Sequence, residues 1–113
     1  MKKIEAIIKP FKLSQVKEAL HELGISGMTL VDVKGFGRQR GSTGGIDSND
    51  GYDDEFLAKM KLEVIVEDNQ VDEVIASIKS SAYSGKIGDG KIFVSNIEQV
   101  IRIRTGEKDS DAV

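Results

Sequence analysis

The chain has 113 residues, a net charge of −3 and an isoelectric point near 5.2, and this length favours a single domain. The acidic balance argues against direct binding to nucleic acid, and the absence of cysteine excludes a disulfide framework and thiol chemistry. His21, the single histidine, cannot form a zinc cluster alone, and we expect it to be exposed to solvent. No signal peptide or membrane-spanning run is recognised, so we expect a cytoplasmic protein.

The first third of the chain predicts a strand, a helix and a second strand. Apolar residues alternate over residues 3–9, which is typical of a strand with one apolar face, and Pro10 ends this strand. From Leu13 the spacing of apolar residues changes to three and four, which predicts an amphipathic helix that Gly24 ends. Alternation returns over about residues 28–35, where we expect the second strand.

The apolar pattern stops between residues 37 and 55, a segment that contains five glycines. A loop of about 19 residues is unusual in a small domain, and such loops are usually functional or disordered. Residues 44–55 contain five carboxylates and no basic side chain. We therefore expect this part of the loop to be disordered until a partner binds.

The next segment predicts a third strand and a second helix. Apolar and charged residues alternate over residues 60–67, which is the clearest strand pattern in the chain. Asp68 or Asn69 is then a candidate N-cap for a helix. The expected buried side of this helix consists of Val71, Val74, Ile75 and Ile78.

The remainder of the chain predicts two short strands and a tail. Residues 91–94 form the expected fourth strand. Alternation over residues 100–104 predicts a further strand, on which Arg102 and Arg104 would face the same side. The tail, residues 106–113, is polar, and we expect it to be mobile.

This order of elements is the split βαβ, or ferredoxin-like, pattern of the α+β class, with a long loop between the second and third strands. Ile7 and Ile65 are apolar but alternate with the core positions, so they lie on the opposite face of the sheet. Exposed apolar sheet surface of this kind indicates that partner subunits cover it. We therefore expect an oligomer.

A glycine-rich segment, residues 84–93, follows the second helix and contains three glycines together with Lys86 and Lys91. Glycine allows the backbone to approach a ligand closely, and successive N–H groups can form an anion site. The pattern is equally compatible with a hairpin turn bearing two solvated lysines. It nearly matches the phosphate-binding loop of nucleotide hydrolases, but Ile92 stands where that motif needs serine or threonine.

Four segments together resemble the PII nitrogen-regulatory signal proteins, and the match runs in order through nearly the whole chain. These segments are residues 7–13, 34–39, 85–93 and 102–107. The resemblance implies a homotrimer of ferredoxin-like subunits whose three intersubunit clefts bind ATP or ADP, and also 2-oxoglutarate when ATP and Mg²⁺ are present. It identifies a T-loop at about residues 37–55, a B-loop at about residues 82–91 and a C-terminal loop at about residues 102–113.

The resemblance also implies a set of ligand-binding positions and no catalytic residue. The positions are Ile7, Thr29, Gly35, Gly37, Arg38, Gln39, Lys59, Ile65, Gly88, Asp89, Gly90, Lys91, Arg102 and Arg104.

Their chemistry suits these ligands, since arginine and lysine bind phosphate oxygens and loop N–H groups add further donors. Gln39 would offer a carbonyl oxygen to Mg²⁺, and Lys59 would pair with a carboxylate of 2-oxoglutarate. Ile7, Gly35 and Ile65 would line the adenine slot. Without the family context, Arg102 and Arg104 would be read as solvated strand residues, and Lys59 as a charged residue that protects an edge strand from pairing.

The T-loop departs from the family pattern, in which a Tyr-Arg-Gly-x-Glu-Tyr segment lies near the tip. Only Tyr52 of that segment remains, and it could accept a nucleotidyl group, although the sequence leaves open whether Tyr52 or Ser48 is modified. Ala58 and Ser84 stand where relatives usually have proline and threonine. The acidic tip predicts a target with a basic docking surface, whether a transporter, an enzyme or a regulator. A membrane would be reached only through such a target.

Two other functions remain open from the sequence. A nucleotide-only sensor of the same fold would have lost the 2-oxoglutarate response, but Gln39 and Lys59 argue against that loss. A slow ATPase would need a positioned base, and the acids of this chain fall mostly in the long loop or on helix surfaces.

Overall fold

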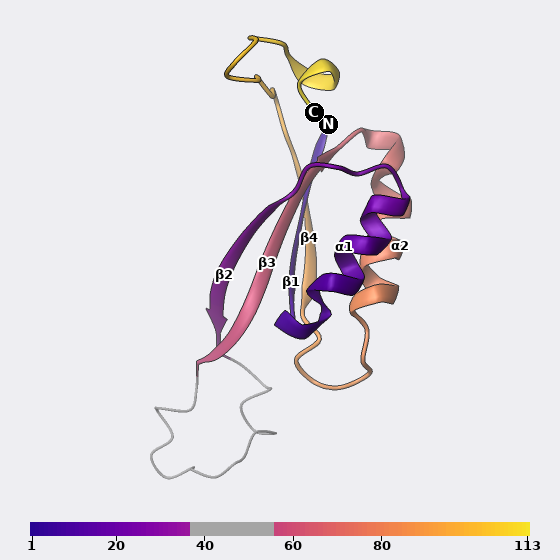
Figure 1. The fold of residues 1–113 in the computed structure, drawn as a ribbon, viewed down its shortest axis with the longest axis vertical. Helices are drawn as coiled ribbons and strands as arrows, with labels where there is room; N and C mark the ends of the chain where they lie inside the picture. Colours follow the sequence, from indigo (N-terminus) through magenta and orange to yellow (C-terminus); the bar gives the residue numbers. More distant parts are fainter. Residues whose placement is uncertain (37–55) are drawn as a thin grey trace.

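The computed structural model describes residues 1–36 and 56–113, which form one antiparallel sheet with two helices on one face (Figure 1). The sheet has the strand order β2-β3-β1-β4, and β1 pairs with both β3 and β4. Its strands are β1 (Lys2–Ile8), β2 (Thr29–Gly35), β3 (Leu57–Val66) and β4 (Lys91–Asn96). The helices are α1 (Leu13–Glu22) and α2 (Val71–Ala82). This is the predicted α+β ferredoxin-like fold.

The core lies between the sheet and the helices, and the alternation of the strands determines it. Ile4 of β1 lies opposite Val64 of β3, so both side chains point toward the helices. The buried set comprises Ile4, Ala6, Ile8, Val16, Leu20, Ile25, Leu62, Val64, Val66, Val74, Ile78 and Ala82. Burial of these side chains is the main favourable contribution to folding.

The end of α1 follows the sequence prediction. Gly24 has a φ of 85°, and its N–H donates to the carbonyl of His21 at 2.9 Å. The Ile25 N–H donates to the carbonyl of Leu20 at 3.0 Å, which completes a Schellman motif. Both Ile25 and Leu20 are buried, so the turn also fixes where the chain leaves the core.

The predicted start of the second helix is wrong. A 3₁₀ turn, η5 (Asp68–Gln70), precedes α2, and the N–H of Glu67 donates to Oε1 of Gln70 at 3.0 Å. Asp68 instead accepts a hydrogen bond from the N-terminal ammonium of Met1 at 3.0 Å. The extra turn moves the start of α2 to Val71, because the side chains and backbone N–H groups of Glu67 and Gln70 hydrogen-bond to each other locally.

The predicted strand at residues 100–104 is also wrong, since Ile101 makes only an isolated bridge to Lys108. The carbonyl of Arg102 accepts from the Gly106 N–H at 2.7 Å, and the Arg102 N–H donates to the carbonyl of Glu107 at 2.8 Å. These local bonds close a turn and use both backbone groups of Arg102. The tail then forms a 3₁₀ turn, η6 (Asp109–Ala112), rather than remaining without structure.

The sheet face away from the helices carries a charged cluster between two isoleucines. The ammonium of Lys3 lies 3.1 Å from Oε2 of Glu5 and 3.9 Å from Oε2 of Glu63, and Lys61 lies 3.6 Å from the same Glu63 oxygen. Ile7 and Ile65 are half-buried at either side of this cluster. Subunits covering this face remain a prediction.

The loop between α2 and β4 packs directly against β1, and Gly90 makes the contact. A Cβ atom on Gly90 would lie 1.6 Å from the carbonyl oxygen of Ile7, and the φ of Gly90 is 102°. Both observations require glycine, because a side chain would displace β1 or the loop and would strain the backbone. The next residue, Lys91, begins β4 and pairs with Ile7.

We predict that Gly90→Ala lowers the free energy of unfolding by about 3 kcal/mol, because overpacking and the positive φ act together. Gly27→Ala is the matched control, since its added Cβ would meet nothing within 4 Å. Urea unfolding of both variants measures the difference. Equal stability of the two variants would show that the loop does not pack on β1 in this way.

Candidate functional site

The candidate site is a cleft at the end of the sheet where β1 ends, between the glycine-rich loop and β3. Its volume is about 520 Å³, within the range of ordinary ligand pockets. Seven predicted positions line it: Ile7, Gly35, Lys59, Gly88, Asp89, Gly90 and Lys91. The predicted phosphate loop and the predicted carboxylate-binding lysine are therefore brought together.

The same cleft is lined by four residues that the sequence analysis did not place in it, namely Phe36, Leu57, Lys86 and Ile87. The Phe36 ring lies 5.9 Å from that of Phe56, so an aromatic pair lies directly after β2 and directly before β3. The sequence analysis singled out Lys86 as a cation of the glycine-rich segment but did not include it among the ligand-binding positions. No sequence pattern marked the apolar residues Phe36, Leu57 and Ile87 as part of a site, apart from their position beside Gly35 and the loop.

Lys59 connects β3 to the loop. Its ammonium donates to the carbonyl oxygen of Gly88 at 2.7 Å. Burial and the nearby charge of Lys9 lower the pKa of Lys59, while Asp89 opposes this effect. Lys9 and Lys59 therefore place two positive charges beside this part of the loop.

The Asp89 carboxylate is bound within the loop itself. Its Oδ2 atom accepts from the N–H groups of Ser84 at 2.8 Å and Gly85 at 2.9 Å, and Oδ1 accepts from the Ser84 hydroxyl. The ammonium of Lys9, which is only 7% exposed, lies 3.2 Å from Oδ1. Partial burial raises the pKa of Asp89, but the hydrogen bonds from Ser84, Gly85 and Lys9 outweigh it and hold that pKa well below its ordinary value.

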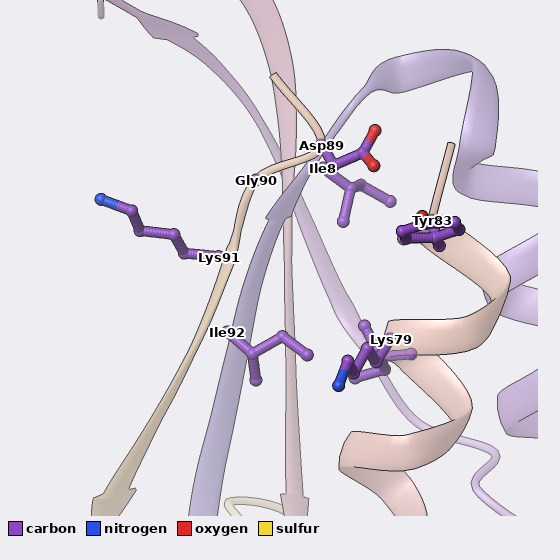
Figure 2. A pocket seen from close by; sticks show the side chains of 9 residues that line it. Ile8, Lys79, Tyr83, Asp89, Gly90, Lys91 and Ile92 are labelled. Carbon is purple, nitrogen blue, oxygen red and sulfur yellow. The ribbon is translucent and has the colours of Figure 1, made fainter. Parts of the chain in front are cut away.

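A second cavity of about 370 Å³ lies on the helix side of the loop. Ile8 and Ile92 point into it from the sheet, and Tyr83 and Lys79 border it from α2 (Figure 2). Lys91 points away from this space, toward the opposite side of β4. This cavity adjoins the apolar core at Ile8 and Ile78 and shares Asp89, Gly90 and Lys91 with the cleft.

Two other predicted positions lie apart from the cleft. Thr29 and Ile65 line a hollow of about 590 Å³ that also includes Glu63 and the C-terminal Val113. Along β3, Ile65 follows Lys59 by six residues, which corresponds to about 20 Å of strand. A single chain therefore does not bring Ile65 into one slot with Ile7 and Gly35.

The two C-terminal arginines are also remote from the glycine-rich loop. Figure 1 shows the C-terminal segment at the end of the sheet where β1 begins, opposite the end that carries the loop. Arg102 and Arg104 lie in or beside a turn rather than on a strand, and Nε of Arg102 is 3.8 Å from Oε1 of Glu107. The expectation that both arginines lie on a strand is therefore wrong, and their place in a ligand cleft stays a prediction.

The remaining predicted positions, Gly37, Arg38, Gln39, Ser48 and Tyr52, lie outside the described residues. Among residues 1–36 and 56–113, no group of three or more histidine or acidic side chains could hold a metal ion. Within the same ranges, the helices are too short or too polar to cross a membrane.

Comparison with known proteins identifies the family. The family model described as "Nitrogen regulatory protein P-II" matches residues 1–107. Proteins named "Nitrogen regulatory protein P-II" from Azospirillum brasilense and from Nostoc punctiforme are each 58% identical over 113 residues, covering the whole of both chains. A crystal structure of Arabidopsis thaliana PII bound to citrate matches with a TM-score of 0.82 and 43% identity, covering 99% of this chain and 91% of that one.

The fold, the cleft with its glycine-rich loop and these full-length matches agree. The chain belongs to the P-II family of nitrogen regulatory proteins, which are signal transducers and not enzymes.

Proposed function

We propose that this signal transducer binds ATP or ADP in clefts between neighbouring copies of the chain, and 2-oxoglutarate together with ATP and Mg²⁺. The observation that carries the proposal is the cleft in which the Gly88–Lys91 backbone, Lys59 and Ile7 converge. The ligands then set the state of the long loop that docks onto target proteins.

The loop supplies the features that bind phosphate. The loop backbone lies between β1 and the cleft. In it, Gly88 and Gly90 have φ values of 101° and 102°, a conformation that residues other than glycine rarely adopt. Loops of this kind direct N–H groups at anions, and Lys86 and Lys91 add full positive charges nearby. We assign the triphosphate to the N–H groups of Gly88–Gly90 and to these two lysines.

The separation of the other positions supports a site that two copies share. Thr29, Ile65 and the C-terminal arginines lie toward the end of the sheet that is remote from the loop, yet all are accessible or half-buried. In a homotrimer, this end of one copy can face the loop of the next. Each of three clefts would then combine a phosphate-binding half with a half that holds the base and further cations.

The 2-oxoglutarate proposal rests on Lys59. Its lowered pKa reflects burial and the charge of Lys9, so a carboxylate placed beside it would be stabilised. Arabidopsis PII, which shares the fold, has been solved with citrate, another polycarboxylate. The triphosphate would provide most oxygen ligands to Mg²⁺, and Gln39 would add a neutral one.

We predict that 2-oxoglutarate binds only in the presence of ATP and Mg²⁺, as calorimetric titration of the full chain would measure. Gln39→Ala should abolish 2-oxoglutarate binding and weaken ATP binding less, because it removes a metal ligand but no phosphate contact. Lys59→Met should have the same effect on 2-oxoglutarate, whereas Lys17→Met, on the exposed surface of α1, should have none.

Two outcomes of this titration would change the proposal. Equal affinity for 2-oxoglutarate with and without ATP would contradict the shared metal. ATP binding without any 2-oxoglutarate response would identify a nucleotide-only sensor.

We further propose that the acidic segment at residues 44–55 selects a protein target with a basic docking surface. Its five carboxylates include Asp47, Asp50, Asp53 and Asp54. Unlike charges accelerate association, and salt screens them within about 10 Å at 0.1 M. The target could be a transporter, an enzyme or a regulator, and the acidic charge is the property that all three would recognise.

We predict that replacing these four aspartates with asparagine weakens target capture from native lysate and removes its salt dependence. The control replaces Asp109 and Asp111, near residue 113, with asparagine and should leave capture unchanged. Capture of the same partner with unchanged salt sensitivity by the four-site variant would rule out acidic docking.

A further inference from the structure

We propose that Asp89 is a positioning residue for phosphate, with Lys9 as its buried counterion. The pair holds residues 84–90 in the shape that presents the Gly88–Lys91 backbone to the ligand. This inference rests on the proposed nucleotide function and gives a role to side chains that need not touch the nucleotide themselves.

An acid in a phosphate-binding loop calls for an explanation, because its charge repels phosphate. In this loop, both oxygens of Asp89 already accept hydrogen bonds, from two N–H groups and one hydroxyl, in addition to the ion pair with Lys9. The carboxylate thus ties Ser84 and Gly85, at the start of the loop, to its own position near the end. It fixes loop shape, and its charge is compensated at short range.

Lys9 fits the role of counterion better than that of phosphate ligand. It is 7% exposed, and its ammonium bridges the Ser84 hydroxyl at 3.1 Å and Asp89 Oδ1 at 3.2 Å. A buried ammonium needs such partners, because an uncompensated charge in the interior is strongly destabilising. Lys9 directly follows β1, so the ion pair anchors the loop to the central strand.

The clamp acts together with two other anchors of the same loop. Gly90 lies against the Ile7 carbonyl, and the Gly88 carbonyl accepts from Lys59. Among the contacts of residues 1–36 and 56–113, it is the Asp89 clamp that joins the two ends of the loop to each other. Without it, bound phosphate would have to order the loop, which would lower affinity.

The test compares ATP with adenosine, since only ATP uses the phosphate loop. We expect Asp89→Asn and Lys9→Met each to weaken ATP binding about tenfold, measured by calorimetry, with adenosine affinity from NMR titration unchanged. The double variant should also lose about tenfold, because the two residues act as one unit. Lys9→Arg keeps the charge and should restore most of the affinity.

A second pair of variants avoids any folding defect from the buried charge. Ser84→Thr keeps the hydroxyl that joins Lys9 and Asp89 and should bind ATP like the parent chain, whereas Ser84→Ala should bind more weakly.

Hydrogen exchange of the Ser84 and Gly85 amides should accelerate in Asp89→Asn, with or without nucleotide, because both N–H groups donate to this carboxylate.

The outcomes separate this inference from the proposed function. Failure of the parent chain to bind ATP would refute the function, while the amide exchange would still test the clamp. Parent-like ATP affinity in Asp89→Asn, or equal losses for ATP and adenosine, would overturn the positioning role. Losses that multiply in the double variant would show that Lys9 and Asp89 act independently, which would also overturn it.

Discussion

The contact between the backbone of Gly90 and the carbonyl of Ile7 is the constraint on which the candidate site depends. A side chain at this position would overlap β1, so the loop can reach the sheet only because residue 90 is glycine. β4 begins one residue later, and its pairing with β1 places Lys91 opposite Ile7. The position of the backbone that we propose to bind phosphate is therefore set by the register of the sheet, which the buried core of β1 and β3 holds in place.

Charge is distributed unevenly over this acidic protein. Four lysines, at positions 9, 59, 86 and 91, gather around one loop, and Asp89 compensates mainly the most buried of them. The segment at residues 44–55 has the opposite charge and none of these cations. A chain with a net charge of −3 can thus combine a cationic cleft, suited to the proposed nucleotide, with an acidic segment, suited to the proposed protein target.

The sequence predicted the fold because each strand has a clear alternation and each helix a clear apolar side. Gly24 could be identified as the end of α1, since a positive φ at this place favours glycine. The glycine-rich loop could also be identified, and the family resemblance assigned its role. The clamp of Asp89, Ser84 and Lys9 could not be predicted, because the lysine is 75 residues from the serine in sequence.

The failures have physical causes as well. Alternation over residues 100–104 resembles a strand, but Thr105 and Gly106 allow a turn that satisfies the backbone locally. Asp68 resembles a helix cap, but the N-terminal ammonium competes for its carboxylate. The positions implied for one nucleotide lie at both ends of the sheet, and the site shared between subunits that the family resemblance implies would join them.

The most direct test is a crystal structure of the full chain with ATP and Mg²⁺. We expect a trimer in which the triphosphate lies against the Gly88–Lys91 backbone of one copy and the base contacts Ile65 of its neighbour. A triphosphate bound away from this loop, or a complete nucleotide site within a single copy, would contradict the shared cleft.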